Sequence, residues 1–278
     1  MQLGYFMPTG GMRNHLAIHA VVTDVAAARV EILPAMLPNI YIRLAGRSSF
    51  TFADGKGIEA PPVSLVGPTA NAYGITLGAG CRMAVVGLLP LGWAGLIGVP
   101  GIECVDGVLD GADIWGVPAV SRLIERLSDT ALDGNHVGLV ETFLMQMVAG
   151  APRPLLRQIA VIDHWLEHSP SLSLDDLCAE LEVGARQMRR ITVEGYGLSP
   201  KTLAMKYRAL RMAALMCQGG GLDAAAHVYA DQSHMIRDFR RFIGSTPAAF
   251  ILDPYNIAAA TIKGRQQAGA TRPLVLLS

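Results

Sequence analysis

Residues 231–247 read DQSHMIRDFRRFIGSTP, and this stretch begins and ends with residues that bound a helix. Aspartate is favoured just before the first helical turn, because its side chain can accept a backbone N–H that the helix leaves unpaired. Glycine is common just after the last turn, because it adopts the left-handed conformation without strain. The stretch therefore predicts a helix over residues 232–243, capped by Asp231 and followed by a Gly-x-Thr-Pro turn.

The same pattern occurs 47 residues earlier in the chain. Gly197-Leu198-Ser199-Pro200 corresponds to Gly244-Ser245-Thr246-Pro247, Met188 to Met235, and Arg190 to Arg237. Upstream, the apolar positions of a short helix are also kept, since Leu177, Cys178 and Leu181 correspond to Ala224, Ala225 and Val228, and Asp176 to Asp223. Each copy reads as a short helix, a tight turn and a longer helix. This is the helix-turn-helix arrangement, whose second helix can lie in the DNA major groove.

The residues on the outer face of each longer helix suit contacts with DNA. The first copy presents three arginines, which can bind guanine or phosphate: Arg186, Arg189 and Arg190. The second copy presents polar residues that can exchange hydrogen bonds with base edges: Gln232, Ser233, His234 and Arg237. In both copies the methionine is expected to face inward. We predict these seven residues as the DNA-binding set, against the alternative of a helical bundle whose basic face is merely solvated.

The charge distribution agrees with a nucleic-acid-binding C-terminal half. The chain of 278 residues has no net charge, but residues 1–150 hold eight Lys or Arg against twelve Asp or Glu, and residues 151–278 hold fifteen against eleven. Residues 186–211 contain seven basic residues and one acidic residue, Glu194. Such asymmetry indicates that one part of the chain meets a polyanion.

The N-terminal part is predicted to be β-rich. Short apolar or alternating segments, punctuated by Gly, Pro, Asn or Asp, are typical of an antiparallel barrel or sandwich: 16–22, 30–33, 40–44, 49–52, 63–66, 74–77 and 83–88. Helices are predicted over 117–127 and 136–148, the second of which serves either as a dimer contact or as part of its own domain's core. The break Gly150-Ala151-Pro152-Arg153-Pro154 is the predicted domain boundary.

Helices are then predicted over 155–167, from the cap Ser173 to about Leu181, and over 186–196, 200–218 and 223–228. The predicted fold class is α+β. A β-rich, cupin-like barrel over 1–150 precedes an all-α domain with two helix-turn-helix units over 151–254, and a tail occupies 255–278.

The uncharged run from Met83 to Ile102 has the length of a membrane span. It contains two prolines and five glycines, however, so short buried strands joined by turns explain it better. The four cysteines are scattered among apolar residues without metal-ligand spacing, which is typical of a reduced, cytoplasmic protein.

Residues 231–247 strongly resemble the second helix-turn-helix of the AraC/XylS family of bacterial transcription regulators. Arg186-Gln187-Met188-Arg189-Arg190 and Gly197-Leu198-Ser199-Pro200 are similar to the first unit, so the resemblance covers residues 155–252. Leu33-Pro34, Val66-Gly67-Pro68 and Gly87-Leu88-Leu89-Pro90 with Trp115-Gly116 are similar to the β-rich sensor domain of one branch. Three positions depart from the family: Val228 replaces a turn glycine, Asp223 an aliphatic residue, and Thr192 a phenylalanine.

Sites for metal or covalent chemistry are not predicted. His15, His19 and His136 of the N-terminal half show no His-x-His spacing and no nearby Glu, so we expect no metal and no other cofactor. Gly-x-Ser-x-Gly and Gly-x-x-x-x-Gly-Lys are absent, and Tyr73, Trp93 and Trp115 are expected to be core residues. His164 and His168 are expected at the surface.

The sequence thus predicts a DNA-binding transcription regulator rather than an enzyme. Its expected partners are double-stranded promoter DNA, a small-molecule effector of unknown identity at the N-terminal domain, RNA polymerase if it activates, and a second copy if it dimerises. Two alternatives remain open. One is a ligand-binding or scaffolding protein with weakened DNA binding, which the departures at Val228 and Asp223 motivate. The other is a β-barrel enzyme fused to a DNA-binding domain.

Overall fold

A computed structural model of the chain describes residues 1–147, 153–169, 171–219, 229, 231–253 and 256–276. Its N-terminal half is β-rich and its C-terminal half is helical, which confirms the predicted fold class. The predicted boundary at residues 150 and 151 lies outside the described residues, together with the last residue of the helix predicted over 136–148. The domain limits therefore stay a prediction.

The strands form two antiparallel sheets. Their bounds are β1 Gln2–Phe6, β2 Leu16–Thr23, β3 Arg29–Leu33, β4 Asn39–Ala45, β5 Ser48–Thr51, β6 Gly57–Glu59, β7 Val63–Val66, β8 Tyr73–Leu77, β9 Arg82–Leu88 and β10 Val108–Asp110. A six-stranded sheet has the order β1-β2-β9-β4-β7-β10, and a four-stranded sheet has the order β3-β8-β5-β6. All seven predicted strand segments are confirmed, and β1, β6 and β10 are additional.

The larger sheet is buried on both faces, and the alternation of side chains along each strand decides which face a residue serves. Tyr41 and Met83 point toward the smaller sheet and pack in the layer between the two sheets. Ile40, Ile42 and Ala84 point the other way, into a second apolar layer beneath helices. Both faces are apolar, so these strands are continuous hydrophobic runs in the sequence.

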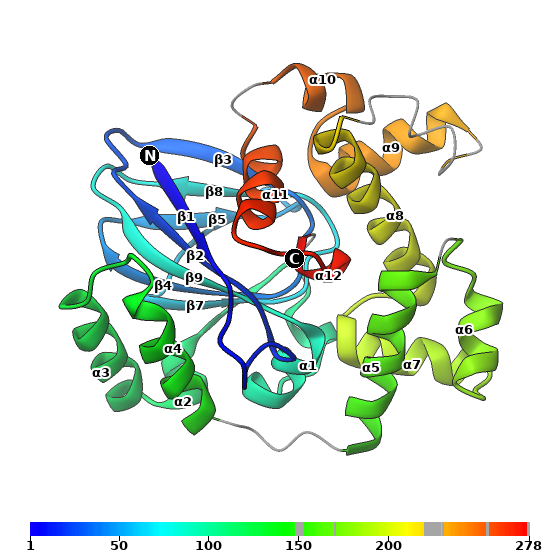
Figure 1. The fold of residues 1–278 in the computed structure, drawn as a ribbon, viewed down its shortest axis with the longest axis horizontal. Helices are drawn as coiled ribbons and strands as arrows, with labels where there is room; N and C mark the ends of the chain where they lie inside the picture. Colours follow the sequence, from blue (N-terminus) through cyan, green and yellow to red (C-terminus); the bar gives the residue numbers. More distant parts are fainter. Residues whose placement is uncertain (148–152, 170, 220–228, 230, 254–255, 277–278) are drawn as a thin grey trace.

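Helices of the N-terminal half cover the outer face of the larger sheet, and Figure 1 shows all of them but the blue-green α1 in green on that side. Their bounds are α1 Pro90–Gly92, α2 Gly111–Trp115, α3 Val117–Ser128 and α4 Asn135–Gln146. Trp93 is buried beside Leu123 and Phe143 of α3 and α4, and Trp115 packs against the same layer. Trp93 and Tyr73, which is buried between the sheets, are core residues as expected, whereas Trp115 is only partly buried.

The uncharged run from Met83 to Ile102 divides between a strand and helical turns. It contains most of β9, then α1 and a π-helical turn Trp93–Ile97, and it enters a 3-10 turn Gly101–Cys104. The predicted strands joined by turns were therefore wrong after Leu88, because Pro90 begins a helix rather than a turn between strands. Within the described residues, no helix is long and apolar enough to cross a membrane.

The C-terminal half consists of helices that share one core. Their bounds are α5 Arg153–His168, α6 Leu174–Glu180, α7 Ala185–Tyr196, α8 Pro200–Cys217, α9 Gln232–Ile243, α10 Pro247–Leu252, α11 Ile257–Gln267 and α12 Pro273–Leu276. The predicted helices over 155–167, 186–196, 200–218 and 232–243 are confirmed. The helix predicted over 223–228 lies outside the described residues. His164 and His168 are exposed on α5, as expected.

The segment after Pro254, for which the sequence predicted only a tail, folds back onto the N-terminal half. Asn256 caps α11 by accepting from the backbone N–H groups of Ala258 and Ala259. The Tyr5 hydroxyl donates to Thr261 Oγ1 at 3.1 Å, and Arg265 is buried between α12 and Met36. Figure 1 shows α11 and α12, in red, against the sheets. Helices α11 and α12 therefore connect the two halves through contacts, in addition to the chain segment that links α4 with α5.

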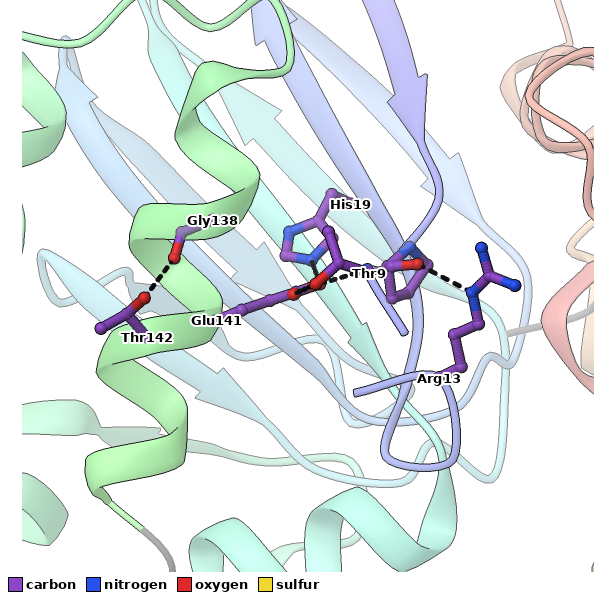
Figure 2. A network of polar contacts seen from close by, with 7 residues as sticks. Thr9, Arg13, His19, Gly138, Glu141 and Thr142 are labelled. Carbon is purple, nitrogen blue, oxygen red and sulfur yellow. Dashed lines mark hydrogen bonds and ion pairs between the residues drawn. The ribbon is translucent and has the colours of Figure 1, made fainter. Parts of the chain in front are cut away.

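A buried polar cluster connects α4 with β2 and with the segment between β1 and β2 (Figure 2). Glu141 Oε1 lies 3.2 Å from His19 Nε2 and accepts from the backbone N–H of Thr9 at 2.9 Å. The Thr9 hydroxyl donates to the other carboxylate oxygen. The sequence has no Glu close to His19, and the fold supplies one by bringing together residues 122 positions apart. Among the described residues, no three or more His, Cys, Asp or Glu are arranged to hold a metal ion.

His136 lies beside this cluster and makes the stability of the fold depend on pH. Burial lowers the pKa of His136 to about 4, so the neutral form is favoured in the folded chain. The unfolded chain binds a proton near pH 6.5, and the free energy of unfolding should therefore fall by up to about 3 kcal/mol between pH 6.5 and 4. We expect His136→Leu to flatten this slope in denaturant unfolding measured across that range. His164→Leu, at an exposed histidine, should leave the slope unchanged, and a variant slope equal to the parent's would contradict the assignment.

Candidate nucleic-acid interface

Helix α7 presents the first set of predicted DNA-binding residues to solvent. It begins after Gly184 and ends at Gly197, whose backbone is left-handed with φ of 68°. Met188 and Ile191 are buried against α5 and α8, as the inward position of Met188 predicted. The opposite face carries three exposed arginines: Arg186, Arg189 and Arg190.

Helix α6 completes the first unit. Ser173 caps it by accepting from the backbone N–H of Asp176, as predicted, and Leu177 is fully buried. The turn to α7 contains Glu182, whose φ is 52°. Thr192, which replaces the family's phenylalanine, is also fully buried, and its hydroxyl donates to the Arg189 carbonyl oxygen at 3.2 Å. The smaller side chain is thus accommodated without leaving its hydroxyl unpaired.

Helix α9 presents the second set. Asp231 caps it by accepting from the backbone N–H of Ser233 at 2.8 Å, and Gly244 ends it with φ of 86°. Met235, Phe239 and Phe242 are buried. The first two turns place the predicted polar residues at the surface: Gln232, Ser233, His234 and Arg237.

Local contacts orient two side chains of the second set. His234 Nδ1 lies 3.1 Å from Asp231 Oδ2, and Arg237 Nε donates to the Ser233 carbonyl oxygen at 3.2 Å. The two sets lie on different helices, and α7 and α9 both contact α8. Asp223 and Val228, the departures in the second turn, lie outside the described residues.

Of the seven basic residues between 186 and 211, Lys206 is buried, and Arg208 and Arg211 are only partly exposed, which the sequence did not show. Lys206 on α8 is 2% exposed and donates to the carbonyl oxygens of Met36 at 2.7 Å and Thr69 at 2.9 Å. Burial lowers the pKa of Lys206 to about 7. Arg211 is half-buried and donates to the carbonyl oxygens of Leu166 and Ser169. Both cations therefore pair with backbone oxygens of neighbouring segments, and the positive surface is smaller than the sequence indicated.

The first unit rests on a buried carboxyl group of α5. The Tyr196 hydroxyl lies 2.6 Å from Asp163 Oδ1 and 3.1 Å from the Ile159 carbonyl oxygen. Burial raises the pKa of Asp163 to about 7, because the hydrogen bond from Tyr196 offsets only part of the lost hydration. The pair holds the C-terminal end of α7 against α5.

The helices that carry the predicted DNA-binding residues lie within a region that matches a known protein family. Residues 177–252 match the family described as a helix-turn-helix domain. The chain carries an AraC-type helix-turn-helix domain. The match spans α6 to α10 and includes all seven predicted DNA-binding residues. Domains of this kind bind DNA in transcription regulators.

Several solved structures are similar to the chain at low sequence identity. An apo lysine-to-alanine variant of ToxT from Vibrio cholerae is 14% identical, with 84% of this chain and 96% of that chain covered and a TM-score of 0.49. Wild-type ToxT from Vibrio cholerae with bound unsaturated fatty acid is 9% identical, with 90% and 94% covered and a TM-score of 0.47. The AraC-like transcriptional activator CuxR is 15% identical, with 77% and 87% covered and a TM-score of 0.29. A comparison with curated proteins found no match.

We expect Asp163 to make the helix-turn-helix domain less stable as pH rises. Because its folded pKa is raised above the unfolded value near 4, the folded chain retains a proton that the unfolded chain has lost. The free energy of unfolding should therefore decrease, by a few kcal/mol at most, between about pH 4 and 7. Asp163→Asn keeps an acceptor for Tyr196 and should flatten this decrease in urea titrations. Tyr196→Phe serves as the comparison, because it removes the donor and should steepen the decrease. Equal slopes in all three proteins would refute the assignment.

Proposed function

We propose that the chain is a sequence-specific transcription regulator whose α7 and α9 read neighbouring major-groove segments of promoter DNA. The main support for this proposal is that both helices share the same structural features and lie within the region that matches a helix-turn-helix family. Each buries its methionine, ends at a left-handed glycine and exposes the side chains that can hydrogen-bond to bases. Arginine forks onto guanine, and Gln and Ser bond to base edges, so sequence discrimination is expected from both helices.

DNA selection tests this function directly. Purified protein is mixed with a random duplex pool over several rounds, and the enriched motif is compared among the parent, Arg190→Ala and Arg237→Ala. Each variant should weaken binding by about 1–3 kcal/mol and relax the motif in a different half. Arg122→Ala, at an exposed arginine of α3, is the matched control and should enrich the parental motif.

The outcomes separate the open interpretations. If Arg190→Ala alone matters, the second unit has a structural role. If no duplex is enriched and binding is weak and insensitive to salt, the chain is a ligand-binding or scaffolding protein with weakened DNA binding.

We also propose that a small-molecule effector binds between the two sheets, where a cavity of about 70 Å³ lies under α11. Its lining is mainly apolar: Leu3, Val22, Leu33, Met36, Ile75, Leu77, Met83, Val85 and Ile257. Polar atoms reach it from Tyr5, Asn39, Tyr41, Thr261 and Arg265. Small-molecule sites usually enclose roughly 300–1,000 Å³, so α11 must shift outward for a metabolite to enter. The same proposal covers the mode of regulation. The bound effector either activates transcription through RNA polymerase or represses it, and the chain acts either alone or as a dimer that forms through the exposed side of α4.

A thermal-shift screen of metabolite fractions tests the effector site. A ligand at a hundred times its dissociation constant should raise the melting temperature by roughly 5 °C. Leu3→Trp fills the cavity from the edge strand β1 and should abolish the shift. Val30→Trp, at a side chain that is 66% exposed on β3, should preserve it. A shift that survives Leu3→Trp places the ligand elsewhere.

A further inference from the structure

The glycine that ends each recognition helix lies in contact with the N-terminal half of the chain. A Cβ atom at Gly197 would lie 2.4 Å from Val105 Cγ2 and 2.9 Å from the Gly101 carbonyl oxygen. A Cβ atom at Gly244 would lie 2.5 Å from Ile32 Cγ2 and 3.1 Å from Ala72 Cβ. These distances are shorter than van der Waals contact, so both glycines are required by close approach as well as by their left-handed backbone. The repeated motif thus forms two equivalent contacts with one body.

Hydrogen bonds strengthen the contact at the second unit. The last carbonyl groups of a helix have no partner within the helix. The backbone N–H of Ala35 donates to the Phe242 carbonyl oxygen at 2.6 Å, and that of Ala72 donates to the Arg241 carbonyl oxygen at 2.8 Å. Arg241 Nε also donates to Asn71 Oδ1 at 3.1 Å. The N-terminal half therefore supplies donors that complete the C-terminal end of α9.

The loop that contains Ala35 and the loop that contains Asn71 and Ala72 also hold α8, the helix between the two units. Lys206 on α8 donates to the carbonyl oxygens of Met36 and Thr69, which lie in the loop after β3 and the loop after β7. Ala35 precedes Met36, and Asn71 and Ala72 follow Thr69. The two loops thus bind α8 and α9 together, whereas the segment Gly101–Val105 packs against α7.

We propose that the N-terminal half is a clamp that positions the two recognition helices relative to each other for binding to paired half-sites. The contacts lie at the C-terminal ends of α7 and α9, whereas all seven predicted DNA-binding residues are exposed. Bases are read mainly by the N-terminal residues of a recognition helix, and the contacts at Gly197 and Gly244 lie at the opposite ends. On α7 the exposed Ile102 of the N-terminal half borders the arginine face, since it lines a pocket with Arg186, Arg189 and Arg190. Holding both helices in place before binding reduces the entropy lost on DNA, which favours duplexes with one half-site spacing. This inference rests on the proposed function.

The clamp also connects the second unit with the cavity between the sheets. The loop after β3 lines that cavity through Met36, and the strand residues on either side of the loop, Leu33 and Asn39, line it as well. The backbone of the same loop bonds to α8 and α9. The Met36 side chain contacts Arg265 of α11, with Sδ 4.0 Å from the guanidinium nitrogen. A shift of this loop therefore changes the cavity wall and the grip on α9 together.

Ile32→Asp is the decisive variant. Ile32 is 49% exposed on the outer face of β3, so the core between the two sheets is not altered, but a carboxylate against Gly244 disrupts the contact. Val30 lies two residues away on the same face and is 66% exposed, so Val30→Asp adds the same charge as a control. Affinities are measured for duplexes that carry the parent's enriched half-sites at the selected spacing, at spacings changed by one and five base pairs, and for a single half-site.

The clamp predicts that Ile32→Asp weakens binding to the selected spacing about tenfold and flattens the dependence on spacing, with unchanged affinity for a single half-site. Val30→Asp should behave as the parent. Parental behaviour of Ile32→Asp on every duplex overturns the proposal, and tighter binding than the parent overturns it in favour of an inhibitory contact.

Amide hydrogen exchange without DNA separates failure of the clamp from failure of the proposed function. In Ile32→Asp, exchange should become faster at Ala35, at Ala72 and in the last turn of α9, whether or not the parent enriches any duplex. Unchanged exchange at these amides overturns the clamp. A parent that enriches no duplex, with faster exchange in the variant, overturns the DNA-binding function and leaves the contact itself demonstrated.

Discussion

The close approach of α7 and α9 to the N-terminal half constrains the rest of this structure. At Gly197 and Gly244 the backbone is left-handed and neighbouring atoms occupy the space of a side chain. Glycine alone among the residues meets both conditions without strain. With these two ends in place, α8 runs past the loops after β3 and β7, and Lys206 becomes buried between them. The two sheets and the C-terminal helices therefore form one packed body.

Burial of charged groups follows from this packing. Lys206, Arg211 and Arg265 are cations whose described partners are mainly backbone carbonyl oxygens. A charged group removed from water is tolerated when hydrogen bonds replace its hydration. Burying these charges is costly unless the surrounding loops place their carbonyl oxygens correctly, so it makes the positions of those loops specific. The burial also reduces the basic surface that remains for DNA.

Local elements could be read from the sequence because their causes are local. The capping residues Ser173 and Asp231, and the spacing of apolar residues, predicted where α6 and α9 begin and which faces are buried. The seven candidate DNA-binding residues could be chosen because Met188 and Met235 indicate the inward face. The polar cluster of His19 and Glu141 could not be predicted, since no pattern within a strand or helix relates residues 122 positions apart. The fold of the residues after Pro254 was missed because α11 has weak apolar periodicity of its own, and because its contacts are with distant segments of the chain.

By itself the sequence determined the fold class, most element bounds, the pattern from inward methionine to terminal glycine that α7 and α9 share, and the outward faces of these two helices. These properties depend on backbone preferences and on the alternation of polar and apolar residues over a few turns. The tertiary structure alone decided which basic residues reach solvent and how α11 and α12 return to the two sheets. It also decided which segments of the N-terminal half hold α7 and α9. Those properties depend on contacts between distant segments, and the free energy of such contacts exists only when the whole chain is packed.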